Sequence, residues 1–397
     1  MSLSKKQKLQ RNQILESLYT RGPLSRAELS RLLGITPATM TEVTAYLIKE
    51  GVIKELGEAG LHTGSGRKKV LLEVAPNYSH YIGVELSEHK MTICLTDNLG
   101  TSVLEEGVSL RFDPTFPLTV NNVREAISTF LTSHAHFSIQ AIGIAIPGHF
   151  EKDSQTIASN NPLWSQFDIA LLLSSFSIPV FVKNNVKCMA LTELYLSSKL
   201  EGHNFLFLNL RRGIFAAYVY EGKLYGDRNY LVGEVGHITV NPEGQQCECG
   251  KTGCLQTYAS ITWILKKSRI AYESGRAFYL QLLVDSASQL TINHVLSAYM
   301  MGDEIIHRII EQAVDYLALQ INNATMMLNL DAVYVHGKLF EESLIATQLQ
   351  TKLEQSIRIV EQNHDIHYQV LEYDSFKGAM GACALAIKNH FINNYLD

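Results

Sequence analysis

The chain has 397 residues, enough for two or three domains with full hydrophobic cores. Hydrophobic residues make up 46% and charged residues 18%, as in soluble globular proteins, and no apolar run reaches the eighteen residues of a membrane span. The N-terminal segment lacks the apolar core of a signal peptide, and the cysteine usage suits a reducing compartment. We therefore expect a cytoplasmic protein with no membrane partner.

The net charge of −5 is divided unevenly along the chain. Residues 1–70 hold twelve Lys and Arg against six Asp and Glu, a net of +6, and the remaining residues carry a net of −11. A basic N-terminal part on an acidic body indicates a polyanionic partner for the N-terminal part alone. We expect that partner to be double-stranded DNA.

The first 76 residues, which we call the head, show the helix signals of a winged helix-turn-helix domain. An apolar helical repeat forms a first helix, and Ser25 with Glu28 makes a capping box that starts a second one. Gly34 suits the end of that second helix, and Thr36 followed by Pro37 starts a third. This arrangement places the third helix in the major groove of DNA.

A wing follows the third helix. Residues 52–56 and 69–74 predict its two strands, and the tip between them is flexible and basic, which suits contact with phosphates or the minor groove. The third helix has no Lys or Arg before Lys49, so base reading must depend on hydroxyls, a methyl group and a carboxylate that accepts from a cytosine amine. The candidate DNA-binding residues are Thr36, Ala38, Thr39, Thr41, Glu42, Arg67, Lys68 and Lys69. A helical protein-interaction module with a solvated basic loop is the open alternative.

The rest of the chain predicts two similar α/β lobes, residues 77–197 and residues 198–375. A hairpin of short apolar strands opens each half, and helices dominate the second half up to about residue 328. The predicted strands are 81–86, 91–97, 102–108, 141–146, 179–182, 204–210, 213–220 and 332–335. A helix is predicted near residues 121–133.

A compact group of metal-ligand residues lies in the second half. His237, Cys247, Cys249 and Cys254 supply one imidazole and three thiolates within eighteen residues, which is the ligand set of a closed tetrahedral structural zinc site. Soft thiolates favour zinc (Zn2+) over magnesium or calcium. The alternative is three cysteines that lie close by chance, with one pair bridged.

This segment resembles the signature of the ROK family of sugar kinases and sugar-responsive repressors. The residues that carry the resemblance are Gly233-Glu234-Val235-Gly236-His237-Ile238-Thr239-Val240 and Cys247-Glu248-Cys249-Gly250-Lys251-Thr252-Gly253-Cys254-Leu255-Gln256-Thr257-Tyr258-Ala259. The resemblance implies an actin-like (ribonuclease H-like, sugar kinase) body with ligand in the cleft between its lobes. It also implies that the last helix, within residues 376–397, returns to the first lobe.

The same resemblance implies that phosphoryl transfer is lost. In the family's first phosphate turn, G-x-D-x-G-G-T, the two turn glycines are replaced by Ser87 and Glu88. In the second loop, Arg211 and Phe215 replace glycines that would allow close approach of the backbone to phosphate. The family's catalytic aspartate is replaced by Asn185, whose amide does not accept a proton at pH 7. We therefore expect no enzyme activity.

The positions that contact sugar in the family are better preserved. The residues that match them are Gly148, Asn160, Asn185, Glu234, His237 and Gln256. Asn185 and Gln256 replace two acidic residues, so the resemblance implies a ligand other than plain glucose. For each polar residue the alternative is an ordinary structural hydrogen bond.

These observations predict a ROK-type DNA-binding transcriptional regulator, a repressor of carbohydrate-uptake or catabolic genes that responds to a sugar or sugar phosphate. We expect a homodimer or homotetramer on a pseudo-palindromic operator, because one winged helix rarely supplies enough contacts. Two alternatives stay open. One is a sugar kinase with an added DNA-binding head, and the other is a regulator controlled by a protein partner.

Overall fold

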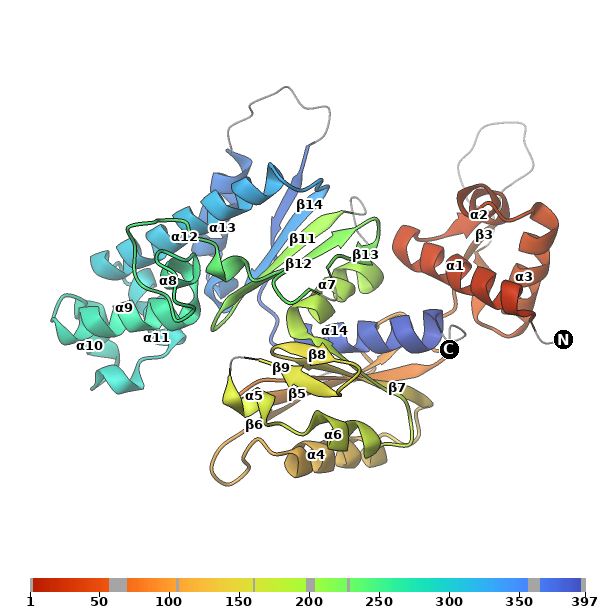
Figure 1. Cartoon of the computed structure of the whole chain (residues 1–397), viewed down its shortest axis with the longest axis horizontal. Helices are drawn as coiled ribbons and strands as arrows, with labels where there is room; N and C mark the ends of the chain where they lie inside the picture. Colours follow the sequence, from red (N-terminus) through yellow and green to blue (C-terminus); the bar gives the residue numbers. More distant parts are fainter. Residues whose placement is uncertain are drawn as a thin grey trace. The chain divides into compact units, whose positions relative to one another are not determined.

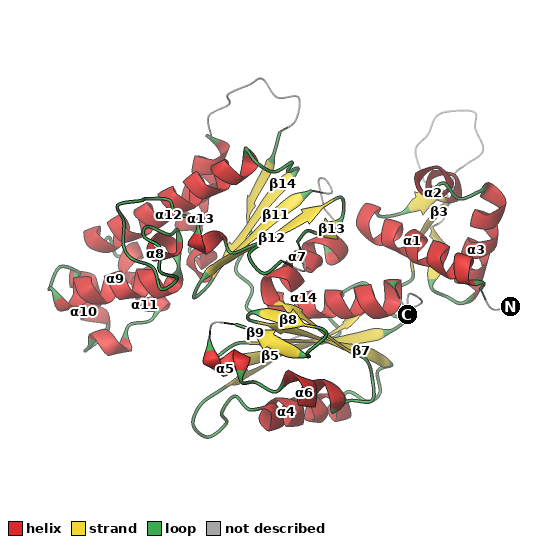
Figure 2. Ribbon diagram, in the orientation of Figure 1, coloured by secondary structure: helices red, strands yellow, loops and turns green. Residues whose placement is uncertain are grey.

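The computed structural model describes residues 3–56, 70–104, 107–159, 161–197, 204–226, 229–355 and 365–393. The chain divides into two compact units, whose elements are shown in Figures 1 and 2. Unit 1 comprises Met1–Leu200 and Ser375–Asp397, and unit 2 comprises Glu201–Asp374. Among the described residues, no helix combines the length and the apolar character needed to cross a bilayer.

The head, which belongs to unit 1, is built from three helices and a small antiparallel sheet. Its helices are α1 (Lys5–Arg21), α2 (Arg26–Leu33) and α3 (Pro37–Lys49). Its strands are β1 (Leu24–Ser25), β2 (Ile53–Leu56) and β3 (Leu71–Val74), in the order β1-β3-β2. The two wing strands were predicted, whereas β1 was not, because two residues carry no readable periodicity.

The predicted caps of α2 and α3 are confirmed. The Glu28 carboxylate accepts from the Ser25 backbone N–H at 2.9 Å, and the Ser25 hydroxyl accepts from the Glu28 N–H at 3.3 Å. Gly34 ends α2 in the left-handed conformation, with φ of 63°. Thr36 caps α3, and Pro37 is its first residue. Local signals therefore fix the turn that orients α3 in the head.

The lobe of unit 1 is a mixed five-stranded sheet with helices on both faces. Its strands are β4 (His80–Leu86), β5 (Lys90–Asp97), β6 (Val108–Arg111), β7 (Ile139–Ile146) and β10 (Val180–Asn184). The order is β10-β7-β4-β5-β6, with β4 parallel to β7 and antiparallel to β5. A small hairpin, β8 (His149–Glu151) and β9 (Thr156–Ala158), follows β7.

Alternate residues of the sheet meet different helices. Ile82 and Val84 of β4 lie in one apolar core with α4 (Val120–Ser133) and α6 (Ile169–Ser174). On the other face, a Cβ added to Gly83 would lie 1.9 Å from the carbonyl oxygen of Ala379 in α14 (Lys377–Ala386). The backbone of α14 therefore rests directly on the strands, which is the position that Figure 2 shows. Successive side chains of a strand point to opposite faces, so Glu85 lies on the α14 face like Gly83.

Two further helices complete unit 1. α5 (Pro162–Ser165) follows the hairpin, and α7 (Asn185–Leu196) begins directly at the end of β10. The helix predicted at the C-terminus is α14, which continues as a π-helix, η4 (Ile387–Ile392).

The strand predicted at residues 102–108 is wrong. β6 begins only at Val108, and Ser102 makes a single isolated bridge with Thr96. The Ser102 hydroxyl donates to the Leu104 carbonyl oxygen, and Gly107 lies against the Phe376 ring, which a Cβ would approach to 2.5 Å. The described residues of this segment therefore form a loop shaped by a side chain more than 260 positions away in the sequence.

Unit 2 repeats the same sheet topology. Its strands are β11 (Phe205–Leu210), β12 (Ile214–Tyr220), β13 (Lys223–Leu224), β14 (Ala332–Gly337) and β15 (His367–Val370). The sheet order β13-β12-β11-β14-β15 corresponds to β6-β5-β4-β7-β10 in unit 1. In each unit the central strand (β4 or β11) is antiparallel to the strand that follows it in the chain (β5 or β12) and parallel to its other neighbour (β7 or β14). The hairpin repeat in the sequence therefore reflects two lobes of one topology.

Helices build most of the core of unit 2. They are α8 (Gln256–Ala259), α9 (Ile261–Glu273), α10 (Phe278–Leu283), α11 (Ile292–Met300), α12 (Glu304–Thr325) and α13 (Ser343–Glu354). Short 3-10 turns lie at Val235–His237 (η1), Ala287–Gln289 (η2) and Lys338–Glu341 (η3). The buried apolar face of α12, with Ile310, Val314 and Leu317 fully buried, shares one core with β11 and β14.

Candidate functional site

The four predicted metal ligands come together in unit 2. One ligand atom from each of His237, Cys247, Cys249 and Cys254 lies within 4.8 Å of every other. Cys249 Sγ is 3.7 Å from Cys254 Sγ, and His237 Nδ1 is 3.6 Å from Cys247 Sγ. In a tetrahedron with Zn–S of 2.3 Å and Zn–N of about 2.05 Å, these separations would be about 3.8 and 3.6 Å. The cluster therefore fits one tetrahedral metal ion.

A short loop held by its own backbone positions these ligands. His237 ends the 3-10 turn η1, and Cys254 pairs with Thr239 in an isolated bridge. The Cys247 N–H donates to the Lys251 carbonyl oxygen at 2.8 Å. Gly253 has φ of 69°, and a Cβ there would lie 1.5 Å from the Asn241 carbonyl oxygen, so only glycine fits the turn before Cys254.

The thiols differ in their environments when no metal is considered. Burial raises the pKa of Cys254 to about 12 and also raises the pKa of Cys247. Burial acts in the same direction on Cys249, but the Lys251 backbone N–H and the neighbouring thiols outweigh it and lower the pKa of Cys249. A metal that binds as a thiolate complex must therefore displace protons from at least the two buried thiols.

Three predicted sugar-contacting residues surround this loop in unit 2. Glu234 is the half-buried residue that precedes η1, and His237 ends η1. Since His237 Nδ1 faces Cys247, its Nε2 is the ring nitrogen left for another partner. Gln256 begins α8. Its side chain lies against Gly213, in the turn between β11 and β12: a Cβ atom added to Gly213 would be 3.1 Å from Gln256 Oε1. The segment that carries Glu234 and His237 lies against β12, since a Cβ at Gly236 would be 2.6 Å from the Ile214 carbonyl oxygen.

The remaining predicted sugar positions belong to unit 1. Gly148 has φ of 92°, and its carbonyl oxygen accepts from the Asn184 Nδ2 at 2.9 Å. Asn184 Oδ1 also caps α7, and Asn185 is the first residue of that helix. Asn160 lies outside the described residues. The structural role of Asn184 was not predicted, although an Asn directly before a helical pattern is a common N-cap signal.

Two carboxylates in the segment that matches the family's first phosphate turn contact asparagines: Glu85 contacts a predicted sugar position, and Glu88 contacts the neighbour of another. The Asn185 Nδ2 donates to Glu85 Oε1 at 3.4 Å, and the Asn161 Nδ2 donates to Glu88 Oε1 at 2.5 Å. Asn161 is the N-cap of α5 and follows Asn160 directly. The sequence predicted carboxylates at this turn but gave no sign of their partners.

The segment that matches the family's second phosphate loop carries Arg211 and Phe215 in place of glycines. The ring of Phe215, on β12, packs against Gly233, where a Cβ would lie 2.4 Å from the ring. The Arg211 backbone N–H donates to the Gly213 carbonyl oxygen at 2.9 Å, and the Arg211 carbonyl accepts from Ile261 at the start of α9. The turn is thus tied down by its own backbone and by α9.

The predicted DNA-contacting residues of α3 are largely exposed. Thr36, Ala38, Thr41 and Glu42 are exposed, and Thr39 is half-buried with its hydroxyl 3.0 Å from that of Thr36. Glu42 Oε1 accepts from the Gln7 Nε2 at 2.9 Å, which gives this carboxylate a structural partner on α1. Arg67, Lys68 and Lys69 lie outside the described residues.

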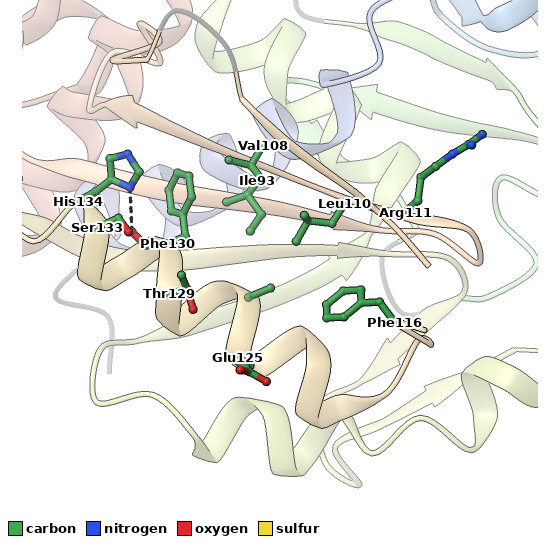
Figure 3. A pocket seen from close by; sticks show the side chains of 11 residues that line it. Ile93, Val108, Leu110, Arg111, Phe116, Glu125, Thr129, Phe130, Ser133 and His134 are labelled. Carbon is green, nitrogen blue, oxygen red and sulfur yellow. Dashed lines mark hydrogen bonds between the residues drawn. The ribbon is translucent and has the colours of Figure 1, made fainter. Parts of the chain in front are cut away.

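A separate apolar pocket of about 560 Å³ lies in unit 1, between α4 and strands β5 and β6 (Figure 3). The residues that line it include Ile93, Leu110, Phe130, Arg111 and Glu125. It contains none of the predicted site residues, so it plays no part in the assignments above.

Comparison with known proteins relates the two parts of the chain to two families. Residues 81–389 match the ROK family, and residues 9–56 match the MarR family. The DNA-binding transcriptional dual regulator NagC of Escherichia coli K12 is 27% identical over 94% of this chain and 91% of its own length. The xylose repressor of Caldicellulosiruptor bescii is 24% identical over 95% of this chain and 94% of its own length.

A solved structure covers nearly the whole chain. The crystal structure of a ROK family transcriptional regulator, a homologue of the E. coli Mlc protein, has a TM-score of 0.72, covers 99% of this chain and 98% of its own, and is 22% identical. The predicted fold class is thereby confirmed: a winged helix-turn-helix domain followed by an actin-like, two-lobed α/β body. The chain belongs to the ROK family.

Proposed function

We propose that this chain is a DNA-binding transcriptional repressor of carbohydrate genes that responds to a sugar or a sugar phosphate. The observation that carries the proposal is the union, in one chain, of a head matching the MarR family and a ROK body. Relatives that share the full length include repressors named for xylose and for N-acetylglucosamine. We assign residues 1–76 to DNA binding and the remainder to effector sensing.

The DNA contacts we propose are made by α3 and the wing. α3 presents Ala38, Thr41 and Glu42 to solvent, and hydroxyl, methyl and carboxylate groups are able to read base edges in the major groove. The basic wing tip, Arg67-Lys68-Lys69, would supply phosphate contacts. Because one head offers few base contacts, we propose a homodimer or homotetramer on a pseudo-palindromic operator.

We propose zinc as the metal of the His237 cluster. Three thiolates and one imidazole are soft to borderline ligands, and four protein ligands leave no open position for a metal-bound water. The ion would brace the loop between η1 and α8 rather than take part in chemistry. In doing so it would hold Glu234 and the Nε2 of His237 in place for a sugar.

We propose that the effector is recognised by hydrogen bonds to its hydroxyl groups. The residues that we propose for these contacts are Gly148, Asn160, Asn185, Glu234, His237 and Gln256. A thermal-shift screen with xylose, N-acetylglucosamine and glucose, each as free sugar and as phosphate ester, tests this step. A ligand that binds only the native state raises the unfolding temperature by mass action.

The DNA assignment predicts two different responses to mutation. Neutralising Arg67, Lys68 and Lys69 together should flatten the dependence of log affinity on log salt by about one unit per lost phosphate contact. Thr39→Ala should change base preference and leave that slope unchanged. Fluorescence anisotropy with duplexes from the chain's own upstream region, at several salt concentrations, measures both.

Lys152→Ala provides the control for the wing variant, because Lys152 is an exposed cation on the β8–β9 hairpin of the body. It should leave both affinity and slope unchanged. Residues 77–397 binding the same duplex as tightly as the full chain would show that the head is not the DNA reader.

The rival function is a sugar kinase with an added head, and it predicts phosphoryl transfer from ATP to a hexose. We expect no turnover. Asn185 donates its amide to Glu85, and an amide does not serve as a general base. Asn185→Asp should remain inactive, since Arg211 and Phe215 still occupy the second phosphate loop. Turnover of about one per second or faster in a coupled ADP assay would favour the kinase.

A further inference from the structure

The candidate effector position Asn185 and the DNA-binding head are joined within unit 1 by two helices. α7 begins at Asn185 and spans 12 residues, about 18 Å. α14 begins at Lys377 and continues through η4 to Ile392. The far ends of both helices contact α1 of the head, whereas their N-terminal ends meet Glu85. The proposal that follows rests on the function proposed above.

The N-terminal ends of α7 and α14 share one carboxylate. Glu85 is 2% exposed and accepts from the Asn185 Nδ2, in the first turn of α7. A Cβ at Gly378, in the first turn of α14, would lie 2.1 Å from the Glu85 carboxyl carbon. The carboxylate therefore rests against the α14 backbone, where the helix dipole favours negative charge. One side chain thus contacts the starts of both helices.

The two helices are packed so closely that they form one rigid pair. A Cβ at Gly381 of α14 would lie 2.4 Å from the carbonyl carbon of Cys188 in α7, so the two backbones are in contact. Lys377 of α14 pairs with Glu193 of α7, and the two side chains are only 17% and 5% exposed. A displacement at the start of either helix is therefore carried along both, because close-packed interiors shift as units rather than deform smoothly.

The opposite ends of the pair hold α1 of the head through polar contacts. The buried Arg11 Nη1 donates to the carbonyl oxygens of Phe391 at 2.9 Å and of Ile392 at 3.3 Å. The Tyr195 hydroxyl, near the end of α7, donates to the Glu16 carboxylate. Burial, followed by the Glu16 charge, raises the pKa of Tyr195, which keeps this phenol a donor. Hydrogen bonds depend on distance and angle, so these contacts with α1 would weaken if the helix ends moved relative to it.

We propose that Glu85 is a positioning residue that couples the effector site to the head. It would do so by holding the N-terminal ends of α7 and α14 in place, while the opposite ends of these helices contact α1. Glu85 would respond to what binds at Asn185, because a sugar that accepts a hydrogen bond from the Asn185 amide competes with Glu85 for that donor. Glu85 then loses one of its contacts, its position against α14 changes, and the contacts that α1 makes with the helix pair change with it.

A double-mutant cycle on the full-length protein tests this coupling without any ligand. Glu85→Ala removes the carboxylate, and Gly378→Ala displaces it with a methyl group. Each single variant should speed amide hydrogen exchange of α1 by about tenfold or more, as measured by mass spectrometry. The double variant should match Glu85→Ala alone, because the methyl group then has no carboxylate to displace. Asp153→Ala, at an exposed carboxylate of the same unit, is the control.

Unchanged exchange in α1 for both single variants would overturn the coupling, as would additive effects in the double variant. Glu85→Gln, which keeps the side-chain shape, serves if Glu85→Ala does not fold, and should show a smaller increase. Where xylose, N-acetylglucosamine or glucose changes operator affinity in the wild type, Gly378→Ala should bind that sugar at least as tightly, because the displaced Glu85 no longer competes for the Asn185 amide. The change in operator affinity that the sugar causes should be at least tenfold smaller in this variant. A wild type that binds no upstream duplex contradicts the proposed function and leaves the exchange result standing.

Discussion

Cys249→Ser is expected to strip most of the zinc from the chain and to destabilise unit 2. Free energies of structural zinc binding are about 10–16 kcal/mol in zinc-finger peptides and are coupled to folding. Loss of about 2–3 kcal/mol from this coupling would lower the unfolding temperature of a domain of this size by roughly 5–10 °C. Elemental analysis and differential scanning calorimetry measure the two effects. Full zinc content with unchanged calorimetric behaviour would contradict the metal assignment.

Two further measurements make the zinc prediction specific. Glu248→Gln, at the exposed residue between Cys247 and Cys249, should keep both zinc and stability. Zinc affinity should also fall as the pH falls. Burial holds the metal-free pKa of Cys254 at about 12 and raises that of Cys247, so zinc binding at neutral pH releases protons from these thiols. For each proton that is released on binding, the zinc affinity should fall by up to tenfold per unit decrease in pH.

Local signals in the sequence were sufficient where a few adjacent residues determine the structure. The capping box of Ser25 and Glu28 and the Thr36-Pro37 start of α3 depend on contacts within four residues. The loop of the His237 cluster is similar, because all four candidate ligands fall within eighteen residues and the spacing itself restricts the geometry. Such features can be predicted from the sequence because the polar groups involved have few other nearby hydrogen-bond partners.

Features set by distant contacts were missed or misplaced. The segment before Val108 is apolar enough to resemble a strand, yet its course depends on Phe376 packing against Gly107. The partnership of Glu85 with Asn185 joins residues one hundred positions apart and has no local signature. β1, β13 and the β8–β9 hairpin consist of strands of two or three residues, too short to show a period of two.

The phosphate turn illustrates how the two kinds of information combine. Comparison with the family's turn identified Glu88 as a departure that removes phosphate binding. The structure places the same residue against Asn161, beside the loop that carries the predicted sugar contact Asn160. The carboxylate that we expect to disfavour phosphate thus holds the residue next to a proposed effector contact.

Glu234→Ala should abolish the response to effector while leaving ligand-free operator binding intact. A hydrogen bond from a sugar hydroxyl to a carboxylate contributes about 1.5–3 kcal/mol, so its loss weakens binding by one to two decades. Glu234 lies outside residues 1–76, to which we assign DNA binding, so we expect operator affinity without sugar to be independent of this side chain. Glu243→Ala, at an exposed carboxylate of the same loop region, should respond like the wild type. Titration of a sugar found in the thermal-shift screen into the protein–operator complex measures all three. An undiminished response in Glu234→Ala would mean that the effector binds elsewhere and that the sugar positions of the family have been abandoned together with its phosphate loops.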